Sequence, residues 1–166
     1  MLRFISAQTI LPWNARMKFI GTAAAIAMLA FTSSAASSQT IRSIETDQAP
    51  PPGGHYSQAV VANGFVFVSG QLPIKPGGGH EIPAGIEAQT RQALSNVDAI
   101  LRAANSSLDR VVSVTVYVTD IENWPKVNRV YADMFGQHRP ARVVAVSSKL
   151  HFGSLVEIQA IALAGK

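Results

Sequence analysis

Two charged residues in apolar surroundings carry the chemistry that this sequence can offer. Arg142 ends a Pro-Ala-Arg motif, and Glu157 lies in the run Val-Glu-Ile-Gln-Ala-Ile-Ala. Residues 143–146 and 155–162 are rich in β-branched and aliphatic side chains and are bounded by Pro and Gly, which predicts strands near a core. An unpartnered charge there costs several kcal/mol. We therefore expect either a structural ion pair between the two residues or a site in which both serve a ligand.

The planar guanidinium of Arg142 can bind a carboxylate through two parallel hydrogen bonds, which suits recognition of a small organic acid. The chain has no cysteine, so neither disulfides nor thiol catalysis are available. Its histidines do not show the spacing of a metal site, and we expect no metal. They are His55, His80, His138 and His151.

The elements that position these charges begin with a β-hairpin. Residues 57–62 and 65–69 flank the dipeptide Asn63-Gly64, which tolerates the positive φ angles of a type I′ turn. The loop at 72–83 contains three consecutive glycines but lacks the Lys-Ser/Thr that a phosphate-binding loop requires. We expect no phosphate site there.

Helical and strand periods alternate after this loop. Apolar residues recur at three- and four-residue steps from Ile86 to Ala104, which predicts a helix with one apolar face. Residues 112–118 alternate between valine and polar residues, which predicts a strand with an aliphatic face made of Val112, Val114, Val116 and Val118. Asp120 is expected to cap a second helix. The buried side of that helix would consist of Trp124, Val127, Tyr131, Met134 and Phe135.

The expected order is strand, strand, helix, strand, helix, strand, strand. Right-handed crossovers would place both helices on one face of a mixed sheet, in an α+β fold. The opposite face would then expose an apolar surface too large for a soluble monomer. We therefore expect the chain to associate with copies of itself.

Five segments, in this order along the chain, resemble the RidA family, also known as the YjgF/YER057c/UK114 family. They are Tyr56–Val60, Val66–Gln71, Val127–Tyr131, the Pro-Ala-Arg motif at 140–142 and Val156–Ala162. The helix segment Gln89–Val97 also matches, and the resemblance extends from about Thr46 to Ala164. Each motif alone would recur by chance, but five in register are specific.

The resemblance implies a chorismate-mutase-like fold and a homotrimer whose three sites lie in clefts between subunits. It implies hydrolysis of reactive 2-imino and enamine acids to 2-oxo acids and ammonia, without metal or cofactor. In this activity Arg142 would anchor the substrate carboxylate and Glu157 would position the water and transfer protons. The implied substrate-binding residues, besides Arg142, are Tyr56, Ser69, Gly70 and Asn128.

These residues also have plain structural interpretations. Tyr56 could cap the core, Ser69-Gly70 could form a turn, and Asn128 could simply be solvated on a helix. The chain also departs from the family at Val144, where a cysteine is common, and at residues 145–147. A noncatalytic small-molecule binder or holdase therefore remains an alternative, and a ribonuclease or translation inhibitor is a second one.

The N-terminus predicts a targeting segment. The apolar run Phe19–Phe31 follows Arg16 and Lys18 and precedes small residues, a pattern typical of a secretory signal peptide. At about thirteen residues the run is shorter than the roughly 20 needed to span a bilayer, so we expect no membrane anchor. Periplasmic or secreted localisation is expected, with a mitochondrial transit peptide as the alternative.

This interpretation divides the chain into three parts. Residues 1–36 would be the signal peptide, with Met17 as a possible true start; residues 37–54 would be an extended, proline-containing lead-in; and residues 55–166 would form one domain.

The charge of the mature chain argues against nucleic acid as a partner. The full sequence has 14 basic and 10 acidic residues. Without residues 1–36 it loses three basic residues and no acidic one, so 11 − 10 leaves +1. Neither a basic stripe nor an RNA-binding aromatic pair is present. The expected partners are therefore a small imino or enamine acid and further copies of the chain.

Overall fold

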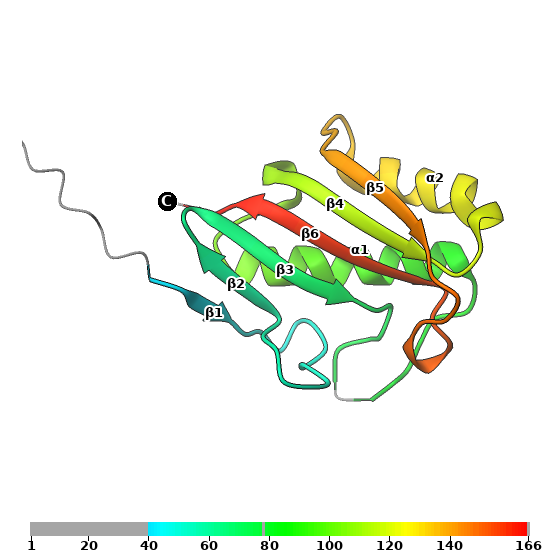
Figure 1. Cartoon of the computed structure of the whole chain (residues 1–166), viewed down its shortest axis with the longest axis horizontal. Helices are drawn as coiled ribbons and strands as arrows, with labels where there is room; N and C mark the ends of the chain where they lie inside the picture. Colours follow the sequence, from blue (N-terminus) through cyan, green and yellow to red (C-terminus); the bar gives the residue numbers. More distant parts are fainter. Residues whose placement is uncertain (1–39, 78, 166) are drawn as a thin grey trace, which may run out of the picture. The chain divides into compact units, whose positions relative to one another are not determined.

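A mixed β-sheet covered on one face by helices forms the part of the chain that the computed structural model describes, residues 40–77 and 79–165 (Figure 1). Its strands are β1 (Arg42–Ile44), β2 (Ala59–Ala62), β3 (Phe65–Gln71), β4 (Val111–Val118), β5 (Ala141–Val146) and β6 (Val156–Leu163). The helices are α1 (Ile86–Ala103) and α2 (Trp124–Phe135), with short 3₁₀ turns at Leu108–Arg110, Ile121–Asn123 and His151–Gly153.

The strands lie in the order β1-β2-β3-β6-β4-β5. Only β4 and β5 pair in parallel among the neighbouring strands described, and the other pairs are antiparallel. Because β3 and β4 both run antiparallel to β6, they are parallel to each other, and α1 connects them. Helix α2 likewise connects β4 to β5. The predicted α+β fold with a mixed sheet is therefore confirmed.

Local sequence explains the hairpin and the first helix. Asn63 and Gly64 have φ angles of 52° and 77°, as the predicted turn requires between β2 and β3. Helix α1 buries the predicted stripe, including Ala93, Leu94, Val97 and Ile100, against β3 and β6. This stripe and the inward residues of the central strands form the core.

Three local predictions need correction. Strand β1 lies in the segment expected to be an aperiodic lead-in, and it pairs with β2. Val111, at 1% exposure, takes the buried position expected for Val112, which is 38% exposed, because the register with β6 shifts between Val111 and Ser113. Asp120 accepts a hydrogen bond from the backbone N–H of Glu122 (3.0 Å), so it caps the 3₁₀ turn that precedes α2.

The segment that follows strand β1 is held by Gln58, a residue that is 1% exposed. Its amide nitrogen donates to the carbonyl oxygens of Thr46 (3.0 Å), Ala49 (3.3 Å) and Pro50 (2.8 Å). Its amide oxygen accepts from the N–H of Thr46 at 2.7 Å. These bonds fix the proline-containing segment after β1 against the sheet, because a buried amide must satisfy its donors and acceptor.

The sheet face opposite the helices carries exposed apolar side chains. Phe65, Phe67, Val143 and Leu163 are 37%, 44%, 59% and 41% exposed. Phe65 pairs with Leu163 across β3 and β6, so their side chains lie on the same face. Such a surface is typical of an association site. In the described part of the chain, no helix is both long and apolar enough to cross a membrane.

Candidate functional site

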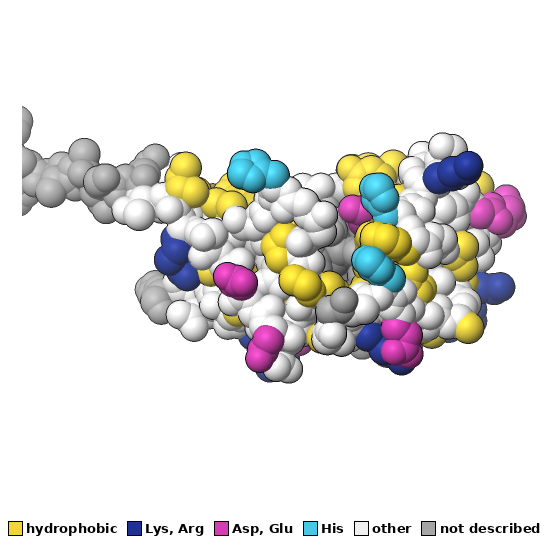
Figure 2. All heavy atoms as spheres, turned by 90° about the horizontal axis from the view of Figure 1, so that it is seen from below, with side chains coloured by type: hydrophobic (Ala, Val, Ile, Leu, Met, Phe, Trp, Pro, Cys, Tyr) yellow, Lys and Arg dark blue, Asp and Glu magenta, His cyan; other side chains and the backbone are white. Residues whose placement is uncertain are grey.

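Glu157 lies near the start of β6, in an open hollow of about 490 Å³. We call this hollow the carboxylate pocket; it is lined by Gly53, Tyr56, Ser69, Gly70, Leu72, His151, Phe152, Glu157 and Gln159. When the molecule is seen from below relative to Figure 1, histidine and hydrophobic side chains gather beside a hollow in its surface (Figure 2). The structure thus brings together four of the predicted site residues: Tyr56, Ser69, Gly70 and Glu157.

Glycine at position 70 is required by the position of the Glu157 carboxylate. A Cβ built on Gly70 would lie 2.0 Å from Oε1 of Glu157. The pairing between β3 and β6 is irregular between Val68 and Gln71, so the strand changes its course next to the carboxylate. The sequence resemblance implied that Gly70 is a substrate-binding residue, and the structure shows that its missing side chain makes space for Glu157.

The carboxylate of Glu157 has no hydrogen bond or ion pair to any residue that the structure describes. Burial raises the pKa of Glu157 above its ordinary value, and the positive charge of His151 opposes that rise. An accessible carboxylate with a raised pKa, unoccupied by protein donors, can accept a proton from water. Its chemistry therefore fits the general base expected at this position.

The hydroxyl groups of Tyr56 and Ser69 are partly engaged by backbone groups. Tyr56 accepts a hydrogen bond from the N–H of Gly53 at 3.0 Å, which leaves its own proton to donate. Ser69 donates to the carbonyl oxygen of Ser57 at 2.7 Å, which leaves its lone pairs to accept. The pocket therefore offers a donor at Tyr56 and an acceptor at Ser69.

Arg142 lies elsewhere, over two aromatic rings of α2. Its guanidinium carbon is 4.4 Å from the ring centroid of Trp124 and 4.5 Å from that of Tyr131. These distances are typical of cation–π contacts, which hold the flat group in one orientation. Arg142 is exposed and forms no ion pair with any described residue, so its hydrogen-bonding edge is open to a ligand.

The hydroxyl of Tyr131 is buried without a hydrogen-bond partner among the described residues. Burial raises the pKa of this hydroxyl, and the positive charge of Arg142 opposes the rise. The ring thus remains a neutral platform beneath the guanidinium at physiological pH.

Asn128 is exposed on α2 and lies in sequence between Trp124 and Tyr131, the two residues whose rings contact Arg142. It is four residues after Trp124 and three before Tyr131, so all three share one side of the helix. Asn128 therefore belongs with Arg142 and not with the carboxylate pocket.

The predicted site residues thus form two half-sites on opposite faces of the sheet. Arg142 pairs in register with the buried Val114, on the helix face. Glu157 pairs with Tyr117, three positions along β4 from Val114 and therefore on the open face. An ion pair between Arg142 and Glu157, the alternative considered from sequence, is absent among the described residues. A single chain does not present both groups to one ligand.

Several lining residues escaped the sequence analysis. Leu72, Phe152 and Gln159 had no predicted role, and His151 was expected to be an isolated histidine. The sequence feature that could have indicated them is Phe152, an aromatic residue directly before Gly153 in a short loop. In residues 40–77 and 79–165, no three histidine or carboxylate side chains are grouped as metal ligands.

Comparison with known proteins places the chain among a large set of relatives. Residues 46–164 match the family model described as "Endoribonuclease L-PSP". A RutC family protein of Pyrococcus horikoshii is 49% identical over 119 residues, which cover 72% of this chain and 94% of the relative. A protein of Capra hircus named 2-iminobutanoate/2-iminopropanoate deaminase is 40% identical over 129 residues, covering 78% and 94%.

Solved structures share the fold. A Rid family protein, YyfA of Yersinia pestis, is 44% identical with a TM-score of 0.73, covering 75% of this chain and 100% of its own. TdcF of E. coli, solved with bound serine, is 37% identical with a TM-score of 0.71, covering 75% and 99%.

The expectation of a periplasmic or secreted protein with a signal peptide is wrong. The relatives give it no support, and a Saccharomyces cerevisiae relative, 39% identical over 124 residues covering 75% of this chain and 85% of its own, is named MMF1, mitochondrial. This relative favours the mitochondrial alternative. Residues 1–36, on which the expectation rested, lie outside the described residues, and so do residues 37–39 of the lead-in.

Proposed function

This chain belongs to the RidA family, the family of the endoribonuclease L-PSP model, and from that premise we propose that it hydrolyses 2-imino and enamine acids to 2-oxo acids and ammonia. The observation that carries the proposal is the Glu157 carboxylate, which has a raised pKa and no protein donor in an open pocket. Relatives about 40% identical bear the name 2-iminobutanoate/2-iminopropanoate deaminase, which agrees with this chemistry.

The reaction needs a held electrophile and a water molecule that can lose a proton. Arg142 would bind the substrate carboxylate through two parallel hydrogen bonds, with Asn128 beside it. Glu157 would accept a proton from water as the water oxygen bonds to the C=N carbon. That proton would pass to the nitrogen, giving an intermediate with one hydroxyl and one amino group on the same carbon. Glu157 would then take the proton of this hydroxyl and return it to the nitrogen as the C–N bond breaks and the C=O bond forms, so one imine and one water give one 2-oxo acid and one ammonia.

Tyr56 and Ser69 would orient the reacting groups. The hydroxyl proton of Tyr56 is available to a substrate or water oxygen, and the lone pairs of Ser69 are available to an imine N–H. Holding the carbon and the water in contact is the main source of rate, because positioning can replace a large part of the activation entropy.

A second copy of the chain would complete the site. Because Arg142 and Glu157 face opposite sides of the sheet, the Arg142 half-site of one copy must meet the carboxylate pocket of another. The exposed apolar residues of the open face give a surface through which copies can associate. The family resemblance supports a homotrimer with three such sites.

The alternative functions have weaker support. Neither lysine nor arginine lines the carboxylate pocket in the described part of the chain, and a pocket with a carboxylate repels the phosphates of RNA. A noncatalytic binder would use the same half-sites without turnover.

The direct test is 2-oxo acid release by purified protein from imino acids generated in the same solution by an amino acid oxidase. Acceleration above the uncatalysed rate, lost in Glu157→Gln, supports the proposal. Binding without acceleration would establish the noncatalytic binder, and cleavage of RNA by the same preparation would favour the nuclease.

A further inference from the structure

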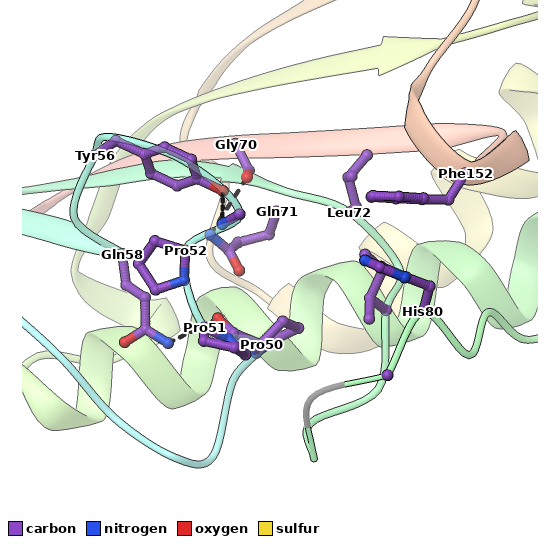
Figure 3. A pocket seen from close by; sticks show the side chains of 13 residues that line it. Pro50, Pro51, Pro52, Tyr56, Gln58, Gly70, Gln71, Leu72, His80 and Phe152 are labelled. Atoms are coloured by element: carbon purple, nitrogen blue, oxygen red, sulfur yellow. Dashed lines mark hydrogen bonds between the residues drawn. The ribbon is translucent and has the colours of Figure 1, made fainter.

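A second hollow adjoins the carboxylate pocket and has a different chemistry (Figure 3). We call it the proline pocket; its walls include Pro50–Pro52, Leu72, Ile74, His80 and Phe152. The two hollows share Gly53, Tyr56, Gly70, Leu72 and Phe152. A ligand whose reacting carbon lies at Glu157 can therefore extend a side chain into the proline pocket.

The proline pocket suits an uncharged, largely apolar group. In the part of the chain that the structure describes, its lining includes no lysine, arginine, aspartate or glutamate. The amide nitrogen of Gln58 is engaged with backbone carbonyls, and that of Gln71 donates to the carbonyl oxygen of Ser69 at 3.0 Å. An apolar group that enters here leaves the amide nitrogens of Gln58 and Gln71 with their hydrogen-bond partners. A charged group would lose water without gaining a counter-charge.

The size of the proline pocket matches an aromatic ring. Its volume is about 160 Å³. An apolar protein cavity of about 150 Å³ accommodates a benzene molecule. A methyl or ethyl side chain would leave most of this space unfilled.

An aromatic pair forms one wall of the proline pocket. The rings of Phe152 and His80 are stacked, with centroids 4.0 Å apart and planes inclined by 21°. In Figure 3 this pair lies across the pocket from Tyr56 and the prolines. A ring bound between these walls can make offset or edge-to-face contacts, which aromatic groups prefer.

The backbone of Phe152, which forms part of this wall, is strained. Phe152 has φ 59° and ψ 22°, in the left-handed region that non-glycine residues seldom adopt, yet its side chain is 55% exposed. Core packing therefore does not account for the strain. Strained residues retained without a packing reason are found at ligand sites.

We propose that the proline pocket binds the side chain of the substrate and selects 2-imino acids with an aromatic or bulky apolar side chain. This inference rests on the proposed imine hydrolysis and specifies its substrate class. Phe152 is the main specificity-determining residue, and His80 supports it by stacking.

The test compares two imines, one with a benzyl and one with a methyl side chain, generated by an oxidase from phenylalanine and alanine. Wild-type protein is expected to have a kcat/KM about tenfold or more higher for the benzyl imine, as filling a fitted apolar pocket allows. Phe152→Ala and His80→Ala should lower this ratio. The control Ile121→Ala alters a half-exposed apolar residue that lines neither pocket and should leave the ratio unchanged.

Binding of stable products separates this inference from the proposed function. Phenylpyruvate should bind wild-type protein about tenfold or more tightly than pyruvate in calorimetry, and Phe152→Ala should remove the difference. Hydrolysis of both imines at equal kcat/KM, or equal affinity for both products, would overturn the subsite while leaving imine hydrolysis intact. Selective binding of phenylpyruvate without any hydrolysis would overturn the proposed reaction and leave the subsite standing.

Discussion

The carboxylate of Glu157 lies where a side chain at Gly70 would have to be, with a Cβ at position 70 only 2.0 Å from Oε1. Gly70→Ala should therefore displace the carboxylate and lower kcat about a hundredfold, because a misplacement of about 1 Å can cost this much. The fold should persist, since the group that must move is the end of a flexible side chain.

Thermal melting and kcat of Gly70→Ala should be measured beside Gly54→Ala. A Cβ at Gly54 would meet only the ring of Tyr56, at an ordinary 3.6 Å. Equal kcat values in the two variants would show that the position of the Glu157 carboxylate does not matter for turnover.

Arg142→Lys should reduce kcat/KM for imino acids about a hundredfold or more. Lysine keeps the charge but loses both the flat two-pronged donor and the stacking on Trp124 and Tyr131. The melting temperature should change little, because Arg142 is exposed and has no carboxylate partner among the described residues.

Arg139→Lys is the matched control, since Arg139 is exposed and close to Arg142 in sequence. Wild-type kinetics in Arg142→Lys would remove the arginine from the proposed site. Unfolding of this variant would instead assign Arg142 a structural role.

Disruption of the open sheet face should dissociate the assembly. Phe67→Asp places a charge on this exposed apolar surface, so light scattering should detect a trimer for wild type and smaller species for the variant. The rate of imine hydrolysis should fall when the assembly dissociates. A wild-type protein that is monomeric at micromolar concentration would contradict the shared site.

Mixed assemblies test whether the two half-sites come from different copies. Arg142→Ala and Glu157→Gln subunits, each inactive alone, should regain about a quarter of wild-type activity when refolded together in equal amounts, because random mixing reunites an intact pair at that frequency. Refolding the double variant with the Glu157→Gln subunit gives the control, since neither contributes an intact glutamate. Activity that stays absent in the first mixture would place both residues of a site on one chain.

The pH dependence of kcat/KM should report the ionisation of Glu157. Burial raises the pKa of Glu157, so hydrolysis should be lost as the pH falls through a value above that of an ordinary glutamate. Removing the opposing positive charge in His151→Ala should move this acid limb to higher pH. His55→Ala, at an exposed histidine outside both pockets, should leave the limb in place.

The stability of the fold should also depend on the ionisation of Glu157. The ionised form that hydrolysis requires should be the less stable one. Because the pKa of Glu157 is higher in the folded than in the unfolded chain, the folded state binds the proton more tightly. The cost of burying the ionised carboxylate is present above the folded pKa and disappears below the unfolded pKa. Glu157→Gln should therefore melt higher than wild type at neutral pH, and this gain should vanish in acid. A pH-independent difference would contradict the raised pKa.

Local patterns explain which elements could be predicted from sequence. The turn at Asn63-Gly64 and the stripe of α1 depend on neighbouring residues, and both are present. Strand β1 has three residues, too few for a period; it is held by pairing with β2, and Gln58 fixes the chain directly after it. A shift in register at Val111 likewise depends on the partner strand β6.

The sequence named candidate site residues but did not indicate how they are arranged. Motif resemblance identified Arg142 and Glu157, but the face on which each lies follows from the register of β4 with β5 and β6, which no local pattern encodes. Phe152 and His80 meet through loop geometry between segments far apart in the chain. Their contact could not be derived from spacing.

The separation of Arg142 from Glu157 also has a genetic consequence. In the proposed trimer each chain gives its arginine to one site and its glutamate to another, so a chain defective in both residues would inactivate two of the three sites in any assembly that it enters. Loss of function would then be dosage-sensitive: a minority of faulty copies would remove a larger share of the activity than their own number.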